Sequence, residues 1–234
     1  MRDLSGWTPP EAPGPMTLAG AYARLEPLAP AHAAALHAAN RADDGIWRWL
    51  GYGPFATEGD YAAWAADAAD RPDPRFFAIF DLDAADPGPA GVASLMRIDR
   101  ANGVVEVGHV CLSPRLQRRR AASEAISLLA AWAFGAGYRR FEWKCDAGNE
   151  PSRRAARRFG FAFEGVFRQH MIVKGRNRDT AWFAMTDGDW PGIAAAHRAW
   201  LDPANFDAGG RQRQRLGDLT AAALARAGAG HSPA

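Results

Sequence analysis

Cysteine and lysine are scarce in this chain of 234 residues. It has only two cysteines, Cys111 and Cys145, and each lies in an apolar or aromatic segment without CxxC or metal-ligand spacing. This pattern argues against a disulfide scaffold, and it gives no indication of a zinc site or of any other metal site. A protein of the reducing cytoplasm fits such a composition.

Long hydrophobic runs and an excess of one charge are also missing. No stretch approaches the length of a transmembrane helix, and MRDLSGWTPPEAPGPM at the start has Pro and Gly where a signal peptide needs an apolar run. The net charge of +2 results from 28 basic and 26 acidic residues, so no global field favours nucleic acid or a membrane surface. We therefore expect a cytoplasmic protein that binds neither.

The periodicity of the apolar residues predicts a mixed α/β fold. Residues 1–16 are rich in Pro and Gly and are expected to form a flexible arm, and residues 17–187 to form the main domain. Residues 188–234 are expected to form a helical extension whose tail, from Phe206, is partly disordered. The predicted elements of the main domain are helices near 30–41 and 57–69, an antiparallel meander over 75–113, a helix over 121–137, a strand over 139–146, a helix over 150–160 and a strand pair over 161–187.

An aromatic segment, DDGIWRWLGYGPF, connects the first two predicted helices. Its Trp47, Trp49 and Tyr52 have two interpretations. They line a pocket for an acceptor molecule, or they form core beneath a long connection.

Basic side chains gather instead at one short stretch, LQRRRAASEA, residues 116–125. It places Arg118, Arg119 and Arg120 at the predicted start of a helix, where unpaired N–H groups and the helix dipole favour a phosphate. Without an anion, the three arginines would repel one another and the dipole. The small side chains that follow, Ala121, Ala122 and Ser123, let a diphosphate approach the backbone. The alternative is that these arginines are simply exposed.

Two blocks of sequence resemble the GNAT (GCN5-related) N-acetyltransferase superfamily, in particular its RimJ/RimL-like branch, over about residues 18–187. The segment QRRRAA, from Gln117 to Ala122, is similar to the family's Q/R-x-x-G-x-G/A loop, but Arg120 stands where the first Gly is usual. The segment NEPSRRAARRFGF, from Asn149 to Phe161, is similar to the family's N-x-x-S-(R/K)-x₅-G-F pattern and is the more specific match.

The resemblance implies a GNAT-like fold, with a central, mostly antiparallel twisted sheet flanked by helices, and acetyl-CoA as co-substrate. It places the pyrophosphate on the loop and helix start from Gln117 to Ser123, and the pantetheine arm on Asn149. It assigns to Ser152 the protonation of the departing CoA thiolate, unless Ser152 only caps its helix. Arg153 is a candidate for the 3′-phosphate.

The proton acceptor for an amine substrate is expected on the strand GVVEVGHVCLSP. Glu106 is the first candidate, acting through water, and its alternative role is a cross-strand partner of Arg97. His109 is the second candidate, and its alternative is a structural hydrogen bond. The two face opposite sides of the strand unless a bulge intervenes, as it often does in the family.

The backbone of the same strand is expected to bind the cofactor arm or the thioester carbonyl through the N–H groups of Val110, Cys111 and Leu112. Cys111 has no obvious activating base, so direct transfer is favoured over an acyl-cysteine intermediate.

The sequence says least about the molecule that accepts the acetyl group. We expect a primary amine on a small molecule or a protein N-terminus, with specificity set by residues 46–55 and 162–187, where Glu164 and His170 lie. The alternatives are a transferase for another acyl-CoA, a non-catalytic CoA-binding protein and an RNA-binding protein. A homodimer is left open.

Overall fold

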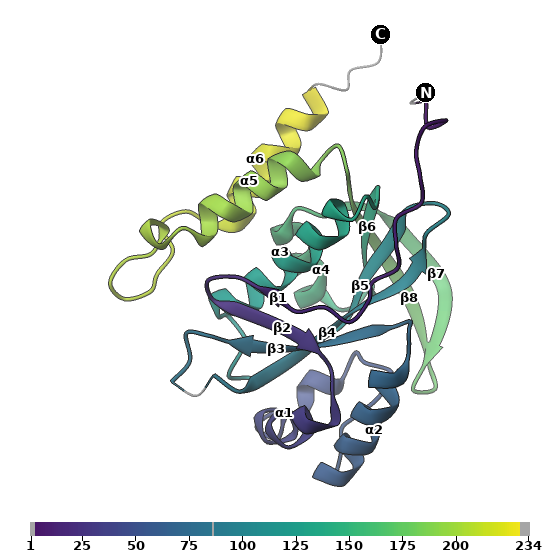
Figure 1. Ribbon diagram of the computed structural model, residues 1–234, viewed down its shortest axis with the longest axis vertical. Coiled ribbons are helices and arrows are strands. Elements are labelled where there is room, and N and C mark those ends of the chain that lie inside the picture. Colours follow the sequence, from purple (N-terminus) through teal and green to yellow (C-terminus); the bar gives the residue numbers. More distant parts are fainter. Residues whose placement is uncertain (1–2, 86, 230–234) are drawn as a thin grey trace.

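Figure 1 shows the computed structural model, which describes residues 3–85 and 87–229. Its centre is one eight-stranded sheet in the order β1-β2-β3-β4-β5-β6-β8-β7. Neighbouring strands in this described part are antiparallel except β5 and β6, which are parallel. The strands are β1 (Leu18–Ala19), β2 (Ala23–Pro27), β3 (Arg75–Asp81), β4 (Pro89–Asp99), β5 (Val104–Leu112), β6 (Arg140–Asp146), β7 (Ala162–Val173) and β8 (Arg176–Thr186).

Helices cover both faces of this sheet (Figure 1). The helices α1 and α2 pack on one face, α3 and α4 pack on the other, and α5 and α6 form a further layer outside α3 and α4. Their bounds are α1 (Ala33–Asn40), α2 (Glu58–Asp70), α3 (Arg120–Gly135), α4 (Glu150–Phe159), α5 (Trp190–Leu201) and α6 (Leu216–Ala229), with short 3₁₀ turns η1 (Pro30–His32), η2 (Asp44–Trp47) and η3 (Pro203–Asn205). The expected mixed α/β fold with a mostly antiparallel sheet is confirmed.

The alternation of each strand sends apolar side chains to two separate cores. In β3, Phe77 and Ile79 face the core under α3, whereas Phe76 and Phe80 face the core under α1 and α2. The strands β5 and β6 send apolar side chains mainly to the α3 side. Their polar side chains therefore share the other face of the sheet, beyond the area that α1 and α2 cover. We call this part of the sheet the open face.

Two helices begin at residues whose side chains cap them. Thr57 and Asp60 form a capping box at the start of α2. Asn149 caps α4, and α4 ends at Gly160, whose φ of 92° favours glycine. A Cβ on Gly160 would lie 3.2 Å from Ile193 of α5, so the close approach of α5 also requires glycine there.

The N-terminal segment lies along the end of the sheet. The guanidinium of Arg100 donates to the carbonyl oxygen of Pro10 at 2.7 Å, and the Tyr138 hydroxyl donates to that of Glu11 at 3.0 Å. Arg139 stacks on Trp7. These contacts attach residues of the expected flexible arm to the main domain, and the division of the chain into three parts stays a prediction.

Within the tail from Phe206, which the sequence predicts to be partly disordered, residues 216–229 form the helix α6. Leu216 and Thr220 of α6 are buried, and the Thr220 hydroxyl donates to the Arg158 carbonyl oxygen at 3.2 Å. The composition is rich in Arg, Gly and Ala, but the few apolar positions fall on one side of a helix. Packing against α4 and α5 outweighs the weak local signal.

Buried His197 of α5 predicts a loss of stability in acid. Its Nε2 lies 2.9 Å from the Phe159 carbonyl oxygen, and burial lowers its pKa to about 4. The unfolded chain, with a histidine pKa near 6.5, binds more protons than the folded chain between these two pH values. Stability is therefore intact above about pH 6.5 and falls by about 3 kcal/mol as the pH drops to about 4.

Urea unfolding between pH 7 and pH 4 checks this expectation. His197→Gln keeps a donor for the Phe159 carbonyl oxygen but does not titrate. In this variant, the free energy of unfolding should depend less on pH than in the native chain. The control is His32→Gln, because His32 is partly exposed and lies on the other side of the sheet. Parallel curves for His197→Gln and the native chain would contradict the assignment.

Candidate functional site

The loop between β5 and α3 leaves the start of α3 without a side-chain cap. Leu116 anchors the loop in the core, and Gln117 closes it by donating to the Leu112 carbonyl oxygen at 3.1 Å. Arg118 has a φ of 62°, and Arg119 occupies the N-cap position without a side-chain hydrogen bond to the helix. The first turn is buried and small, with Ala121, Ala122 and Ser123. Its N–H groups are therefore placed to meet a ligand.

The three arginines of this loop differ in their partners. Arg119 lies 2.8 Å from buried Asp81, and Arg120 lies 2.7 Å from Asp83. Among the described residues, the Arg118 side chain forms no hydrogen bond or ion pair. The mutual repulsion inferred from sequence is thus relieved for two arginines by carboxylates of the turn after β3. Arg118 is the one whose charge is left for another anion.

The path of Arg120 explains how a side chain replaces the usual glycine. Its guanidinium lies over the rings of Tyr22, at 4.3 Å, and Phe206, at 4.8 Å. Ser123 accepts a hydrogen bond from Arg158 at 3.0 Å. Sequence reasoning missed the contacts of Arg120 with Phe206 and of Ser123 with Arg158, because the partners in each pair are far apart in the chain.

Glu124, which lies in the stretch LQRRRAASEA, has a structural function. Its buried carboxylate accepts the N–H groups of Ala21, Tyr22 and Ala23 at 3.0, 2.6 and 2.6 Å. This joins α3 to the start of β2. Gly20 is needed beside it, because a Cβ there would lie 2.3 Å from the Glu124 carboxyl carbon.

The second block places Asn149 and Ser152 at the start of α4. Asn149 Oδ1 accepts the Ser152 N–H at 3.2 Å, so Asn149 is the cap, and the alternative that Ser152 caps this helix is wrong. Ser152 Oγ accepts the indole N–H of Trp143 at 3.0 Å. Because Trp143 takes up a lone pair of this oxygen, the hydroxyl proton is directed elsewhere. Arg153 donates to the Ala147 carbonyl oxygen at 3.3 Å.

Between these two helix starts, β5 and β6 separate. Their parallel ladder ends at Val107 and Trp143, although β5 continues to Leu112 and β6 to Asp146. The backbone of Val110, Cys111 and Leu112 lies in this separated part. The site residues expected from both sequence blocks thus lie around one opening in the sheet.

A bulge in β5 puts Glu106 and His109 on the same face. The register with β4 shifts between the pairs Ser94–Gly108 and Val92–Cys111, and His109 has a φ of 51°. His109 contacts the rings of Phe76 and Tyr52, at centroid distances of 5.0 and 5.5 Å. The expectation of opposite faces held only without a bulge, and the bulge is present.

Glu106 lies in a chain of alternating charges on this face. Arg97 Nη1 donates to both of its carboxylate oxygens at 2.8 and 2.7 Å, which confirms the cross-strand pair named as the alternative to catalysis. Lys144 Nζ lies 3.0 Å from Glu106 and 2.6 Å from Glu142. Arg140 then joins Glu142 to Glu164. Sequence reasoning missed Lys144 and Glu142, although RRFEWKCD shows their alternation with apolar residues.

The titration of two strand residues is strongly altered. Burial, followed by the charges of Arg97 and Arg178, lowers the pKa of His109 to about 4, so its imidazole is neutral at pH 7. Burial raises the pKa of Cys111 to about 12. This thiol is therefore not a nucleophile at neutral pH, which supports direct transfer over an acyl-cysteine.

The aromatic segment that includes η2 contributes to the core and also reaches the candidate site. Trp47 is buried and belongs to the core under α1 and α2. Tyr52 stacks on Trp64 at 4.9 Å and also contacts His109, so it borders the site. Lys174, in the β7–β8 turn, donates to the carbonyl oxygens of Trp47, Tyr52 and Gly53 at 3.0, 3.3 and 2.9 Å. This lysine ties the tip of the hairpin to the loop.

The two residues expected to meet an acceptor lie on β7. Glu164 is paired with Arg140, which lowers the pKa of its carboxyl. His170 Nδ1 lies 2.9 Å from Thr180 Oγ1, and its ring is near Trp182. Only His170 therefore lies by the aromatic side chains of the open face.

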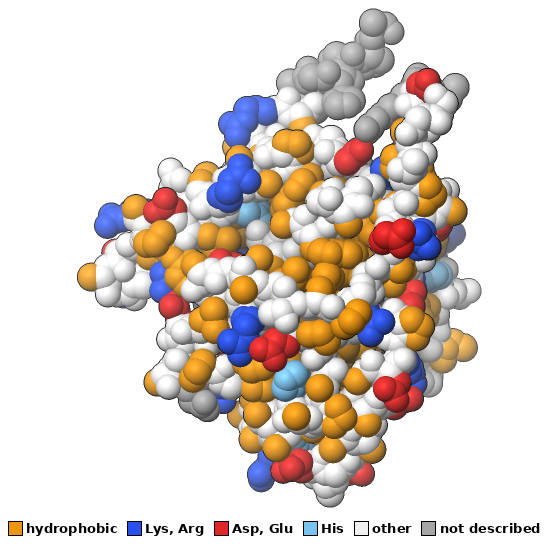
Figure 2. Space-filling model, viewed as in Figure 1, with side chains coloured by type: hydrophobic (Ala, Val, Ile, Leu, Met, Phe, Trp, Pro, Cys, Tyr) orange, Lys and Arg blue, Asp and Glu red, His pale blue; other side chains and the backbone are white. Residues whose placement is uncertain are grey.

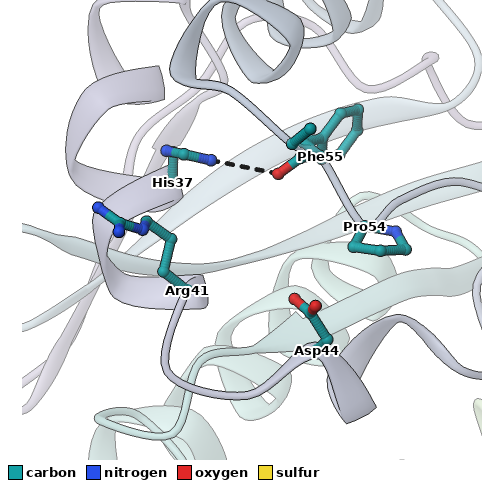
Figure 3. A pocket seen from close by; sticks show the side chains of 6 residues that line it. His37, Arg41, Asp44, Pro54 and Phe55 are labelled. Carbon is teal, nitrogen blue, oxygen red and sulfur yellow. Dashed lines mark hydrogen bonds between the residues drawn. The ribbon is translucent and has the colours of Figure 1, made fainter.

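A hollow of about 360 Å³ lies apart from these residues, between α1 and the loop before α2. Figure 3 shows the ring of His37 donating a hydrogen bond to the Phe55 carbonyl oxygen, with Arg41, Asp44 and Pro54 around it. None of the expected catalytic or cofactor-binding residues lines it, although Pro54 and Phe55 belong to the segment 46–55 that is expected to contribute to specificity. We therefore assign it no part in the chemistry.

Charges on the rest of the surface are mixed. In Figure 2, acidic and basic side chains lie scattered and often side by side on the face shown. Within residues 3–85 and 87–229, no group of three His, Cys, Asp or Glu side chains is arranged to hold a metal ion. In the same part of the chain, no helix has the length and apolar character needed to cross a membrane.

Comparisons with known proteins agree on one family. The model of the acetyltransferase (GNAT) domain matches residues 23–162. The solved structure of a GCN5-related N-acetyltransferase from Brucella melitensis is 46% identical, with a TM-score of 0.90, and the match covers 93% of this chain and 100% of that one. A GNAT-family protein from Chromobacterium violaceum ATCC 12472 is 41% identical, with a TM-score of 0.76 and coverage of 82% and 96%.

A more distant structure is RimL, a ribosomal L7/L12 alpha-N-protein acetyltransferase. It is 22% identical, with a TM-score of 0.63 and coverage of 73% of this chain and 94% of that one. At this identity the likeness concerns the fold alone. No protein among the curated ones matches the chain significantly.

Proposed function

Because the chain belongs to the GNAT family of N-acetyltransferases, we propose that it transfers an acetyl group directly from acetyl-CoA to a primary amine of a small molecule or a protein N-terminus. The observation that carries this proposal is the uncapped start of α3, with Arg118 beside it, next to the opening between β5 and β6. A phosphate-bearing thioester fits both features at once.

The residues present fit the phosphates of CoA. The N–H groups of Ala121, Ala122 and Ser123 have no capping side chain, and the small side chains allow close approach. Arg118 adds a positive charge, and Arg153 at the start of α4 is the candidate for the 3′-phosphate. Arg119 and Arg120 hold the loop through Asp81 and Asp83, which makes them positioning residues in this proposal.

The acetyl group would lie at the opening between the strands. The N–H groups of Val110, Cys111 and Leu112 are candidates to bind the arm or polarise the thioester carbonyl. In the reaction, the amine nitrogen bonds to the carbonyl carbon, the carbon–sulfur bond breaks, the nitrogen loses a proton and the CoA thiolate gains one.

The two proton transfers are assigned to opposite sides of the opening. His109 is neutral at pH 7, so it can accept the proton from the nitrogen, directly or through water. Glu106, the first candidate from sequence, already binds Arg97 and Lys144, and we assign it the positioning of these cations. Ser152 is the donor for the thiolate, with Asn149 beside it for the pantetheine arm.

Isothermal titration with acetyl-CoA and with CoA, at two salt concentrations, tests the cofactor site. We expect micromolar binding that weakens with salt, and a further loss of about 10-fold or more in Arg118→Glu, because a charge-assisted phosphate contact becomes a repulsion. Arg168→Glu, in an exposed arginine on β7, should bind as the native chain does.

Two outcomes would count against the site. Equal losses in Arg118→Glu and Arg168→Glu would show that only the overall charge matters. A folded chain that binds neither ligand would overturn the CoA site, and salt-sensitive RNA binding would then be measured.

A further inference from the structure

Arg178 is a partly buried cation without a contacting counter-ion. It lies on β8, its Nε is buried without an acceptor, and its side chain forms no hydrogen bond or ion pair in the described part of the chain. Burial lowers the pKa of its guanidinium. Removing a guanidinium from water without a partner costs free energy, so this position calls for a partner outside the chain.

The strand directs Arg178 to the open face beside the proposed chemistry. The β7–β8 register shifts between the pairs Phe167–Thr180 and Met171–Arg178, but the extra residues lie on β7. Residues 178, 180 and 182 of β8 therefore keep the strand alternation and share one face, where Lys144 Nζ lies 3.9 Å from the ring centre of Trp182. Thr180 pairs with Asp146 at the end of β6, so Arg178 lies beyond that end. The positive charge of Arg178 contributes to the lowered pKa of His109, which lies in the part of β5 that has separated from β6.

The neighbouring carboxylates are engaged by other groups. Glu106 binds Arg97 and Lys144, and Asp146 Oδ1 accepts the N–H of Gly148 at 2.8 Å. The positive charge of Arg178 is therefore not neutralised by contact.

A second donor on the same face also lacks an acceptor. The indole Nε1 of Trp182 is buried, and it has no partner among the described residues. Two unpaired donors on one strand face indicate a ligand rich in acceptor oxygens.

We propose that Arg178 binds an anionic group of the acceptor, so that the preferred substrates are small amines that also carry a carboxylate. The planar guanidinium fork matches the two oxygens of a carboxylate. This inference rests on the proposed acetyl transfer and narrows its substrate class. It disfavours simple polyamines, which the same charge repels.

The test compares pairs of amines that differ by one carboxylate: phenylalanine with phenethylamine, and lysine with cadaverine. Acetyl-CoA consumption is followed by thiol release, and the ratio of kcat/KM within each pair is measured for the native chain and for Arg178→Gln. Because a carboxylate also alters the amine pKa, only the change in this ratio between variants is informative. We expect the ratio to fall about 10- to 100-fold in Arg178→Gln.

Arg176→Gln is the matched control, since Arg176 is exposed on the same strand and its loss changes the net charge equally. The control should keep the native ratio. Arg178→Lys, which keeps the charge but not the fork, should give an intermediate ratio, and it serves if Arg178→Gln fails to fold.

The outcomes separate the two proposals. If amines are acetylated but the ratio is the same in Arg178→Gln, the inference is wrong and the proposed function stands. If CoA binds and no amine of either kind consumes acetyl-CoA, the proposed function fails and the inference with it.

Discussion

Lys144→Met is expected to lower the free energy of unfolding by about 3 kcal/mol, the low end of the range for breaking a buried ion pair. The Lys144 side chain is 6% exposed and lies between Glu106 and Glu142, which face each other across the β5–β6 ladder. Removing the cation leaves two buried carboxylates side by side. The loss is moderated because Arg97 and Arg140 still contact them.

Urea unfolding followed by tryptophan fluorescence measures this effect. The chain has one other lysine, Lys174, whose hydrogen bonds go only to carbonyl oxygens of the aromatic segment. Lys174→Met should therefore lower the free energy of unfolding by about 1 kcal/mol. Adding Glu142→Gln to Lys144→Met should recover part of the loss, because one carboxylate is then neutral. A similar small loss in both lysine variants would show that the network contributes little.

Ser152→Ala is expected to lower kcat about 100-fold, with little change in KM for acetyl-CoA, if Ser152 protonates the leaving thiolate. The substitution also removes the acceptor of the Trp143 indole N–H, which should cost about 1 kcal/mol of stability. Steady-state kinetics under saturating amine and acetyl-CoA gives both constants.

Trp143→Phe separates the two effects. It removes the indole donor but keeps the Ser152 hydroxyl, so kcat should stay within about threefold of the native value if the hydroxyl acts as the acid. An equal fall of kcat in both variants would assign Ser152 a structural role. A native kcat in Ser152→Ala would move the proton donor to solvent.

The order of helices and strands was accessible from sequence because short-range signals agree with it. Thr57 and Asp60 have the spacing of a capping box and indicate the start of α2. Asn149 and Pro151 indicate the start of α4, and Gly160 indicates its end. These signals depend on residues that are close in the chain. The helix α6 lacked such signals, since its stability comes from packing against α4 and α5.

The candidate site residues could be named from the sequence, but most of their contacts could not. The bulge at His109 follows from the register of β4 and β5, which no local pattern determines. The pairing of Arg119 with Asp81 joins residues far apart in the chain. Arg178 and Trp182 could not be identified as candidate site residues before the strand order placed β8 beside β6.

The C-terminal helices determine where the chain can be shortened or fused to another protein without loss of the fold. The matched family segment ends at residue 162, yet β8 lies inside the sheet, and Ile193 and Trp200 complete the core. Phe206 and Trp200 also cover the guanidiniums of Arg120 and Arg158. A chain shortened to residues 23–162 would expose apolar surface and would remove one aromatic contact from each of these two arginines. We therefore expect the shortest segment that folds stably to extend to the end of α6.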